Sequence, residues 1–208
     1  MKRMRQPKIR SGRDPLSRSN ILLTILTTLF ITGLVIGALC VRTAENDVLD
    51  KVIRMFRNYI EVRAQQQMFQ NFASSFIVGN ICIVLLYLLG LAAWGAPVIL
   101  CIPMFEGLGV GMTCGTLYAD YGWAGFGYSA LIIVPGALIS AIGVIYAARE
   151  SLRCSARLFS EHCLSRAVER EPFKDYSIKF LILAMLILLA AAVDMVTIRI
   201  FAGLLPLG

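Results

Sequence analysis

A run of 21 residues without a charged side chain, residues 21–41, limits what this chain can fold into. A helix of that length, rising about 1.5 Å per residue, crosses a hydrocarbon core about 30 Å thick. Four more apolar runs lie at residues 72–94, 97–119, 125–148 and 180–201. Hydrophobic residues make up 58% of the chain, and its mean hydropathy of +0.73 exceeds that of soluble domains. We therefore predict an all-α, polytopic integral membrane protein with about five transmembrane helices.

Short connections predict how the middle helices pair. Residues 95–97, with the sequence GAP, join the second run to the third, and residues 120–125, DYGWAG, join the third to the fourth. Links this short place the helices on either side antiparallel. We expect residues 72–148 to form a three-helix core with a Gly-rich central hairpin. Residues 97–148 are also compatible with a re-entrant segment, because glycines and Pro135 are tolerated at membrane depth where protein buries them.

The distribution of positive charge predicts the orientation of these helices. Residues 1–20 form a basic leader with seven Lys or Arg against one acid, residues 149–179 hold seven more, and residues 42–70 hold five. Cytoplasmic segments of membrane proteins are enriched in Lys and Arg. We therefore place the amino terminus and the 149–179 loop of this multi-pass cell-membrane protein in the cytoplasm. Residues 42–70 then lie outside, and the last span with its carboxyl terminus, residues 180–208, ends outside.

The external segment, residues 42–70, has the pattern of an amphipathic helix. Its apolar side chains recur at helical spacing, at Leu49, Val52, Ile53, Phe56 and Ile60. One interpretation is a helix that packs on the rest of the protein or lies at the lipid surface. The other is a docking surface for a partner, for which Arg54, Arg57 and Glu61 are the candidate contacts.

The residue pattern contains no signature of catalysis or metal binding. The single histidine, His162, lies in the predicted cytoplasmic loop, and the six cysteines include no C-x-x-C pair. There is no P-loop and no H-E-x-x-H motif. We therefore predict that the protein is not an enzyme and has no catalytic residues, metal ligands or cofactors.

Four glycines stand out in the third apolar run. Gly107, Gly111 and Gly115 recur every four residues, so on a helix they form one smooth face that another backbone can approach closely. Gly109 lies between them and either widens this face or loosens the helix. The glycines predict a helix-packing surface.

Glu106 precedes these glycines and follows Pro97 by nine residues, which places it near the middle of the membrane. A charged carboxylate facing lipid there costs at least about 2.5 kcal/mol, so we expect it to face protein or water. In a structural interpretation it is hydrogen-bonded, with Asn80, Thr113 or the backbone of a broken helix as the partner. In a functional interpretation it belongs to a proton or cation path.

Asp194 is a second acid within an apolar run, toward the outer end of residues 180–201. Arg199 follows five residues later, about 140° around the helix, so the two do not form an i, i+4 pair. We expect Arg199 to extend to the outer interface.

One stretch of the chain resembles a known family. Residues 86–139, LYLLGLAAWGAPVILCIPMFEGLGVGMTCGTLYADYGWAGFGYSALIIVPGALI, are similar to the core of the stage II sporulation protein M family. The shared features are a helix ending near G-x-P, an F-[charged]-G motif with small residues every four, a G-W-x-G turn and an apolar helix with a proline. The positions that match by this resemblance are Gly95, Pro97, Phe105, Glu106, Gly107, Gly111, Gly115 and Pro135.

This resemblance implies a non-catalytic membrane scaffold of endospore formation. Members of the family sit in the mother-cell membrane at the septum and localise two peptidoglycan-degrading proteins, stage II sporulation proteins D and P. The implied process is engulfment of the forespore, in which peptidoglycan remodelling lets the mother-cell membrane migrate around it. The matching residues are carried over as helix-packing positions only.

Two further functions are compatible with the residues. A small membrane transporter or channel would use Glu106 and, with five spans, would need to form a homo-oligomer. A lipid-interacting membrane organiser would use the basic leader and loop against the bilayer. The net charge of +7 is explained by topology and anionic lipid, and we expect no nucleic-acid partner.

Overall fold

The structure is a computed structural model that describes residues 15–42, 51, 54–55, 58, 68–164 and 173–201. Within these residues it contains helices and one short turn, residues 91–95. The helices are α1 (Pro15–Arg42), α3 (Met68–Gly90), α4 (Ala96–Tyr128), the π-helix η1 (Ser129–Ile133), α5 (Val134–Leu164) and α6 (Phe173–Phe201). The prediction of an all-α fold is confirmed.

Four helical segments in the described part of the chain are long and apolar enough to cross a membrane. They are Asn20–Arg42, Ala96–Gly127, Ser129–Ser160 and Phe173–Thr197. The remaining predicted span, residues 72–94, corresponds to α3, whose apolar portion, Phe76–Gly90, is shorter. The chain is therefore a multi-pass membrane protein with four long apolar helices and a shorter apolar portion in α3.

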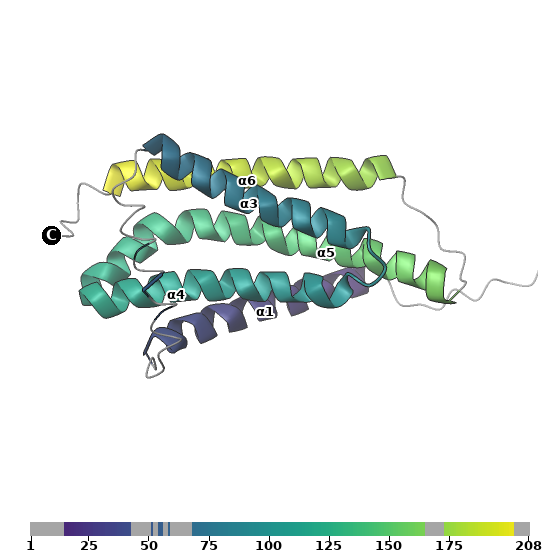
Figure 1. Cartoon of the computed structure of the whole chain (residues 1–208), viewed down its shortest axis with the longest axis horizontal. Helices are drawn as coiled ribbons and strands as arrows, with labels where there is room; N and C mark the ends of the chain where they lie inside the picture. The colour runs from purple at the N-terminus through teal and green to yellow at the C-terminus, as the bar shows by residue number, and fades with distance from the viewer. Residues whose placement is uncertain are drawn as a thin grey trace, which may run out of the picture.

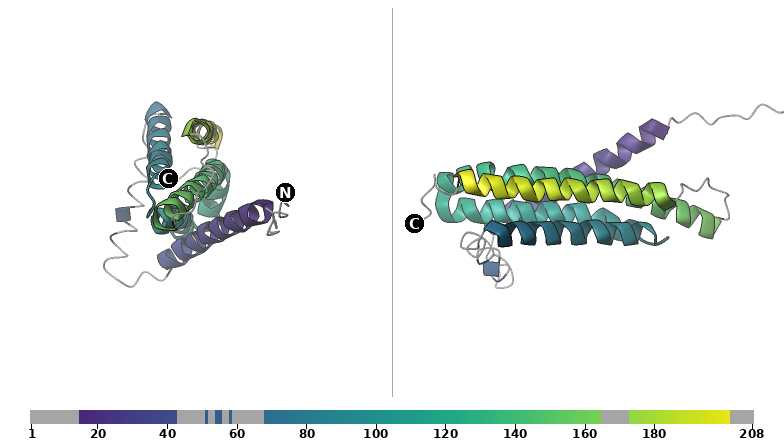
Figure 2. Two further views of the ribbon diagram at one scale, coloured as in Figure 1. Left: turned by 90° about the vertical axis from the view of Figure 1, so that its right-hand side faces the viewer. Right: turned by 90° about the horizontal axis from the view of Figure 1, so that it is seen from above.

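The helices form an elongated bundle around the antiparallel pair α4 and α5 (Figure 1). Helix α1 packs against α4, whereas α6 packs against both α3 and α5. Seen end-on, α1 lies on one side of the central pair, and α3 and α6 lie on the other (Figure 2). The 91–95 turn and the beginning of α6 lie at one end of the bundle, and the end of α6 lies at the other (Figure 1).

The turn between α3 and α4 is as short as its sequence predicts. The amide of Gly95 donates to the carbonyl of Ala92 over 3.1 Å, and Pro97 follows in the first turn of α4. Proline fits there because the first amides of a helix have no partner within the helix. A Cβ at Gly95 would overlap the carbonyl oxygen of Leu89, so the close approach of the backbone explains this glycine.

The reversal between α4 and α5 differs from the expected non-helical turn at residues 120–125. Helical structure continues to Tyr128 and is interrupted only at Gly122, which adopts φ 59° and ψ −132°. Glycine adopts a positive φ without the strain of a side chain. The π-helix η1 follows, and Pro135 stands at the beginning of α5, where its missing amide is tolerated. One kink and a wider helical turn thus replace a loop.

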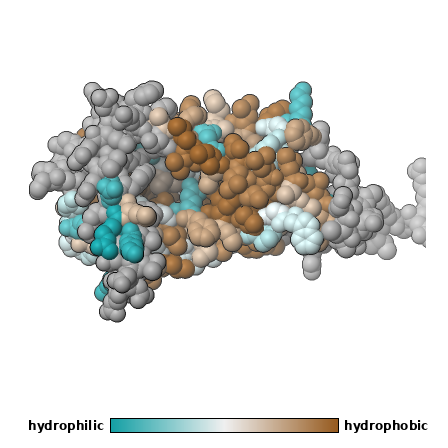
Figure 3. Space-filling model, in the orientation of Figure 1, coloured by the Kyte–Doolittle hydropathy of each residue, from teal (hydrophilic) through white to brown (hydrophobic). Residues whose placement is uncertain are grey.

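Buried apolar side chains from five helices form the core. Fully buried examples are Leu26 of α1, Leu86 of α3, Ile99 of α4, Val144 of α5 and Ile187 of α6. Large apolar side chains also cover the outside of the bundle, such as Leu181, which is 66% exposed. They form a broad hydrophobic zone in the middle of the molecule (Figure 3), as expected for a surface that faces lipid.

Candidate functional site

The glycines of α4 meet the backbone of α1. A Cβ at Gly107 would overlap the carbonyl oxygen of Phe30, and a Cβ at Gly111 would overlap that of Leu34. Gly115 lies against Val41, with 3.1 Å between the position of a Cβ and the nearest atom of that side chain. No side chain larger than hydrogen fits at Gly107 or Gly111 without moving the two helices apart.

Helix α1 carries a matching pair of glycines. A Cβ at Gly33 would overlap the carbonyl oxygen of Met104, and a Cβ at Gly37 would overlap that of Leu108. Both helices therefore have small residues four apart at the contact, the arrangement that brings membrane helices closest together. The sequence analysis identified the glycines of α4 but not α1 as their partner, although the spacing of Gly33 and Gly37 is visible in the sequence.

Gly109 does not belong to this contact. A Cβ there would have no atom within 4 Å, apart from its own helix backbone and chain neighbours. Its carbonyl oxygen accepts a hydrogen bond from Thr113 Oγ1 over 2.9 Å. Gly109 therefore does not widen the face formed by Gly107 and Gly111.

Glu106 lies between α4 and α5 and bonds to Ser140. Ser140 Oγ donates to Glu106 Oε1 over 2.8 Å. The second carboxylate oxygen, Oε2, is buried, and the described residues supply no hydrogen bond to it. Asn80 and Thr113, the partners suggested from the sequence, bond instead to carbonyls one turn earlier in their own helices. Ser140 escaped notice because a pairing between residues 34 apart has no local signature.

Asp194 of α6 contacts α5 one helical turn away from the bond between Glu106 and Ser140. Its carboxylate packs directly on Gly136, at a place that a Cβ of that residue would occupy. Gly136 and Ser140 are four residues apart, so they lie on one face of α5, separated by about 6 Å along the axis. The structure thus brings the two intramembrane acids, Glu106 and Asp194, to adjacent turns of one helix. The side chain of Arg199 lies outside the described residues.

The π-helix is held to both neighbouring helices. Ser129 Oγ lies 2.9 Å from Cys114 Sγ of α4 and donates to it. Thr197 Oγ1 of α6 lies 3.1 Å from the carbonyl oxygen of Ile132. Pro135 comes two residues after η1 ends. π-helical turns are rare and concentrate at functional sites. We therefore count η1 with Asp194 as part of the candidate site.

Residues of α5 that are seven apart, beginning with Gly136, contact α6. Seven residues after Gly136, Gly143 lies against Ile187, with 3.2 Å between the position of a Cβ and Ile187 Cδ1. Gly79 of α3 meets the same Ile187 from another side, which leaves this side chain 2% exposed. A further seven residues along, Glu150 binds Lys179 over 3.0 Å. One face of α5 therefore follows α6 over most of its length.

Hydroxyl groups connect the end of α3 to α5 and α6. Ser151 Oγ donates to the carbonyl of Leu86 over 2.7 Å, and Ser155 Oγ donates to that of Ala92 over 2.8 Å. Tyr176 Oη of α6 donates to the carbonyl of Tyr87 over 3.0 Å. Tyr87 is one of the last four residues of α3, whose carbonyls lack the usual partner within the helix, and the Tyr176 hydroxyl supplies one. The two serine hydroxyls attach α3 and the 91–95 turn to α5. The sequence analysis did not identify them.

The proposed docking segment is described only at separate residues. Arg54 is exposed, whereas Arg57 and Glu61 lie outside the described residues. The side chain of His162 lies outside them as well. Among the described side chains, no group of three His, Cys, Asp or Glu is placed to hold a metal ion.

Comparison with known proteins gives one match. The model of the family described as stage II sporulation protein M matches residues 26–193. No curated protein and no solved structure matches the chain. The matched range includes the segment 42–70, the glycine face of α4 and the contact of Glu106 with Ser140.

Proposed function

Because the chain belongs to the stage II sporulation protein M family, which contains sporulation-associated membrane proteins, we propose that it is a non-catalytic membrane scaffold of endospore formation. Its task is to localise peptidoglycan-remodelling proteins during engulfment of the forespore. The partners are stage II sporulation proteins D and P, and the location is the mother-cell membrane at the septum. The observation that carries this proposal is the family match over residues 26–193, which takes in the external segment as well as the membrane helices.

The packing of the bundle supports a role in holding other proteins. The contacts of Gly107 and Gly111 are to backbone atoms of α1, and Ile187 is enclosed by glycines of two helices. Contacts of this kind leave little room for helices to slide, because interiors packed to this density resist small displacements. A rigid bundle holds the end of α1, which leads into the segment 42–70, at a fixed place.

The arrangement of the helix ends fits the proposed orientation. The beginnings of α1 and α6 and the end of α5, which lie in or next to the segments that we place in the cytoplasm, are at the same end of the bundle as the 91–95 turn (Figure 1). The end of α1, which leads into the segment 42–70, lies at the opposite end, as does the end of α6. The docking surface then faces the peptidoglycan.

Affinity purification from sporulating cells tests the docking surface. We expect the tagged protein in mild detergent to recover the two peptidoglycan-degrading proteins, as identified by mass spectrometry. Arg54→Glu should reduce this recovery severalfold at an unchanged protein level, because it reverses the charge of an exposed side chain. The matched control is Lys174→Glu, since Lys174 is exposed at the beginning of α6. Unchanged recovery across Arg54, Arg57 and Glu61 variants would refute the docking assignment.

A second candidate function is transport of protons or cations, and one observation favours it. Glu106 of α4 and Asp194 of α6 contact adjacent turns of α5. Ser140 is bonded to Glu106, and the Thr197 hydroxyl donates to the backbone carbonyl of Asp194. Polar groups inside a membrane bundle mark ion or proton paths in many proteins. In proteoliposomes, a proton-coupled flux that Glu106→Gln abolishes would establish this function, and its absence from the parent protein would eliminate it.

A further inference from the structure

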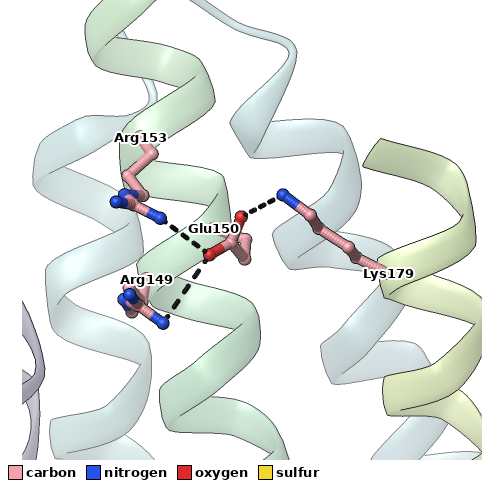
Figure 4. A network of polar contacts seen from close by, with 4 residues as sticks. All are labelled: Arg149, Glu150, Arg153 and Lys179. Atoms are coloured by element: carbon pink, nitrogen blue, oxygen red, sulfur yellow. Dashed lines mark hydrogen bonds and ion pairs between the residues drawn. The ribbon is translucent and has the colours of Figure 1, made fainter. Parts of the chain in front are cut away.

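Four charged side chains meet where α5 and α6 lie side by side, at the end of the bundle near the 91–95 turn. Arg153 lies 3.3 Å and Arg149 lies 3.8 Å from Glu150 Oε1, and Lys179 of α6 lies 3.0 Å from Glu150 Oε2 (Figure 4). We call these four residues the Glu150 cluster. It contains three positive charges and one negative charge, a net charge of +2.

The exposures within the Glu150 cluster leave its positive charge accessible. The side chain of Glu150 is 13% exposed, whereas those of Arg153 and Lys179 are 32% and 38% exposed. The carboxylate is thus enclosed by its partners, and two of the three cations also reach the surface. Arg153 and Lys179 are therefore the members of the cluster that a second anion can reach from outside, and their positive charge attracts it.

Neighbouring aromatic side chains place the cluster close to the boundary between membrane and water. Trp94 in the 91–95 turn is 78% exposed and meets Phe159 edge-to-face, with 5.9 Å between the ring centroids. Exposed Trp side chains gather at the boundary between membrane and water. Ser155, which bonds to the same turn, follows Glu150 by five residues, or about 7.5 Å along α5. The cluster therefore lies slightly inside the boundary.

Apolar side chains continue from the cluster toward the middle of the bundle. On α5, Arg149 Cζ lies 6.0 Å from the centroid of the Tyr146 ring, and Tyr146 is 44% exposed. On α6, Ile182 and Met185 follow Lys179 and are 64% and 62% exposed. A positively charged group at the end of an exposed apolar surface matches a phospholipid, which has an anionic headgroup and acyl chains.

We propose that the Glu150 cluster binds the headgroup of an anionic phospholipid in the leaflet that surrounds this end of the bundle. Arg153 and Lys179 contact the phosphate, Arg149 supports the local charge, and Glu150 holds the three cations together. The acyl chains lie along the exposed surfaces of α5 and α6. This site does not depend on the scaffold function, because it follows from the charges and exposures of the cluster and from the aromatic and apolar side chains around it.

Thermal unfolding of the full-length protein in mild detergent tests this site. Added phosphatidylglycerol should raise the melting temperature more than the same amount of phosphatidylcholine. Arg153→Gln and Lys179→Gln should each weaken the apparent affinity for phosphatidylglycerol about fivefold, the effect of one basic residue near an anionic surface. Lys51→Gln is the control, because Lys51 is an exposed cation outside the cluster.

Glu150→Gln separates lipid binding from a purely structural role. This variant removes the negative charge, so it should lower the melting temperature without lipid and yet increase the gain from phosphatidylglycerol. An equal loss of the gain in Glu150→Gln, Arg153→Gln and Lys179→Gln would overturn the proposal. So would an equal gain from phosphatidylcholine, or the full gain from inorganic phosphate alone, which would indicate a site for free anions.

Discussion

The bundle accommodates the carboxylate of Glu106 through a hydrogen bond from Ser140. A carboxylate facing lipid is unfavourable, and the structure directs Glu106 between α4 and α5, where Ser140 donates to Oε1 over 2.8 Å. Because the two residues belong to different helices, the bond also joins those helices. The same side chain therefore has a structural role in the scaffold and is the first candidate for a role in transport.

Removal of the Ser140 hydroxyl should weaken the bundle. In Ser140→Ala, Glu106 Oε1 loses its donor while remaining within the protein, which costs about 1–3 kcal/mol. We expect a melting temperature in detergent several degrees below that of the parent. Thr28→Ala is the control, because the Thr28 hydroxyl is exposed and bonds to the carbonyl of Thr24 in its own helix. Equal melting temperatures for Ser140→Ala and the parent would contradict the structural role of this bond.

Among the helices, glycines lie at the closest contacts of two neighbouring pairs. Helices α1 and α4 approach each other through Gly33 and Gly37 on one side and Gly107 and Gly111 on the other. Helix α6 is held in another way, because Ile187 fits between Gly79 and Gly143. Small residues thus bring α1 to α4, and a large side chain in a glycine-lined space brings α6 to α3 and α5.

Two alanine substitutions two residues apart should have different effects. Gly111→Ala places a methyl group against the carbonyl of Leu34, so α1 and α4 must separate, and we expect less folded protein and a lower melting temperature. Gly109→Ala adds the same group where no atom lies within 4 Å, and alanine favours helix over glycine by about 1 kcal/mol. We therefore expect the abundance of Gly109→Ala to equal or exceed that of the parent. Equal stability of the two variants would show that α1 and α4 do not pack through Gly111.

At the scale of the whole molecule, the sequence predicts the helices well and their pairing poorly. The apolar runs and the pair Gly95 and Pro97 are local signals, so the all-α membrane fold and the first hairpin follow from them. The glycine spacing predicts a packing face but cannot name the facing helix, because several helices have small residues four apart. The bond between Ser140 and Glu106 and the contact of Asp194 with α5 join residues that are far apart in the chain, so no local pattern predicts them. The reversal at Gly122 needs only one residue with a positive φ. The residue types at 120–125 are the same as those of a loop, so the sequence does not show that the helix continues through them.

Localisation of a partner in sporulating cells tests whether this protein is a scaffold for peptidoglycan remodelling. The measurement is the fluorescence at the septum of a labelled stage II sporulation protein P in sporulating cells, with and without the gene for this protein. We expect a concentrated septal signal in the parent, a dispersed signal in the deletion, and recovery on re-expression of the full chain. A septal signal of equal strength in the deletion would contradict it.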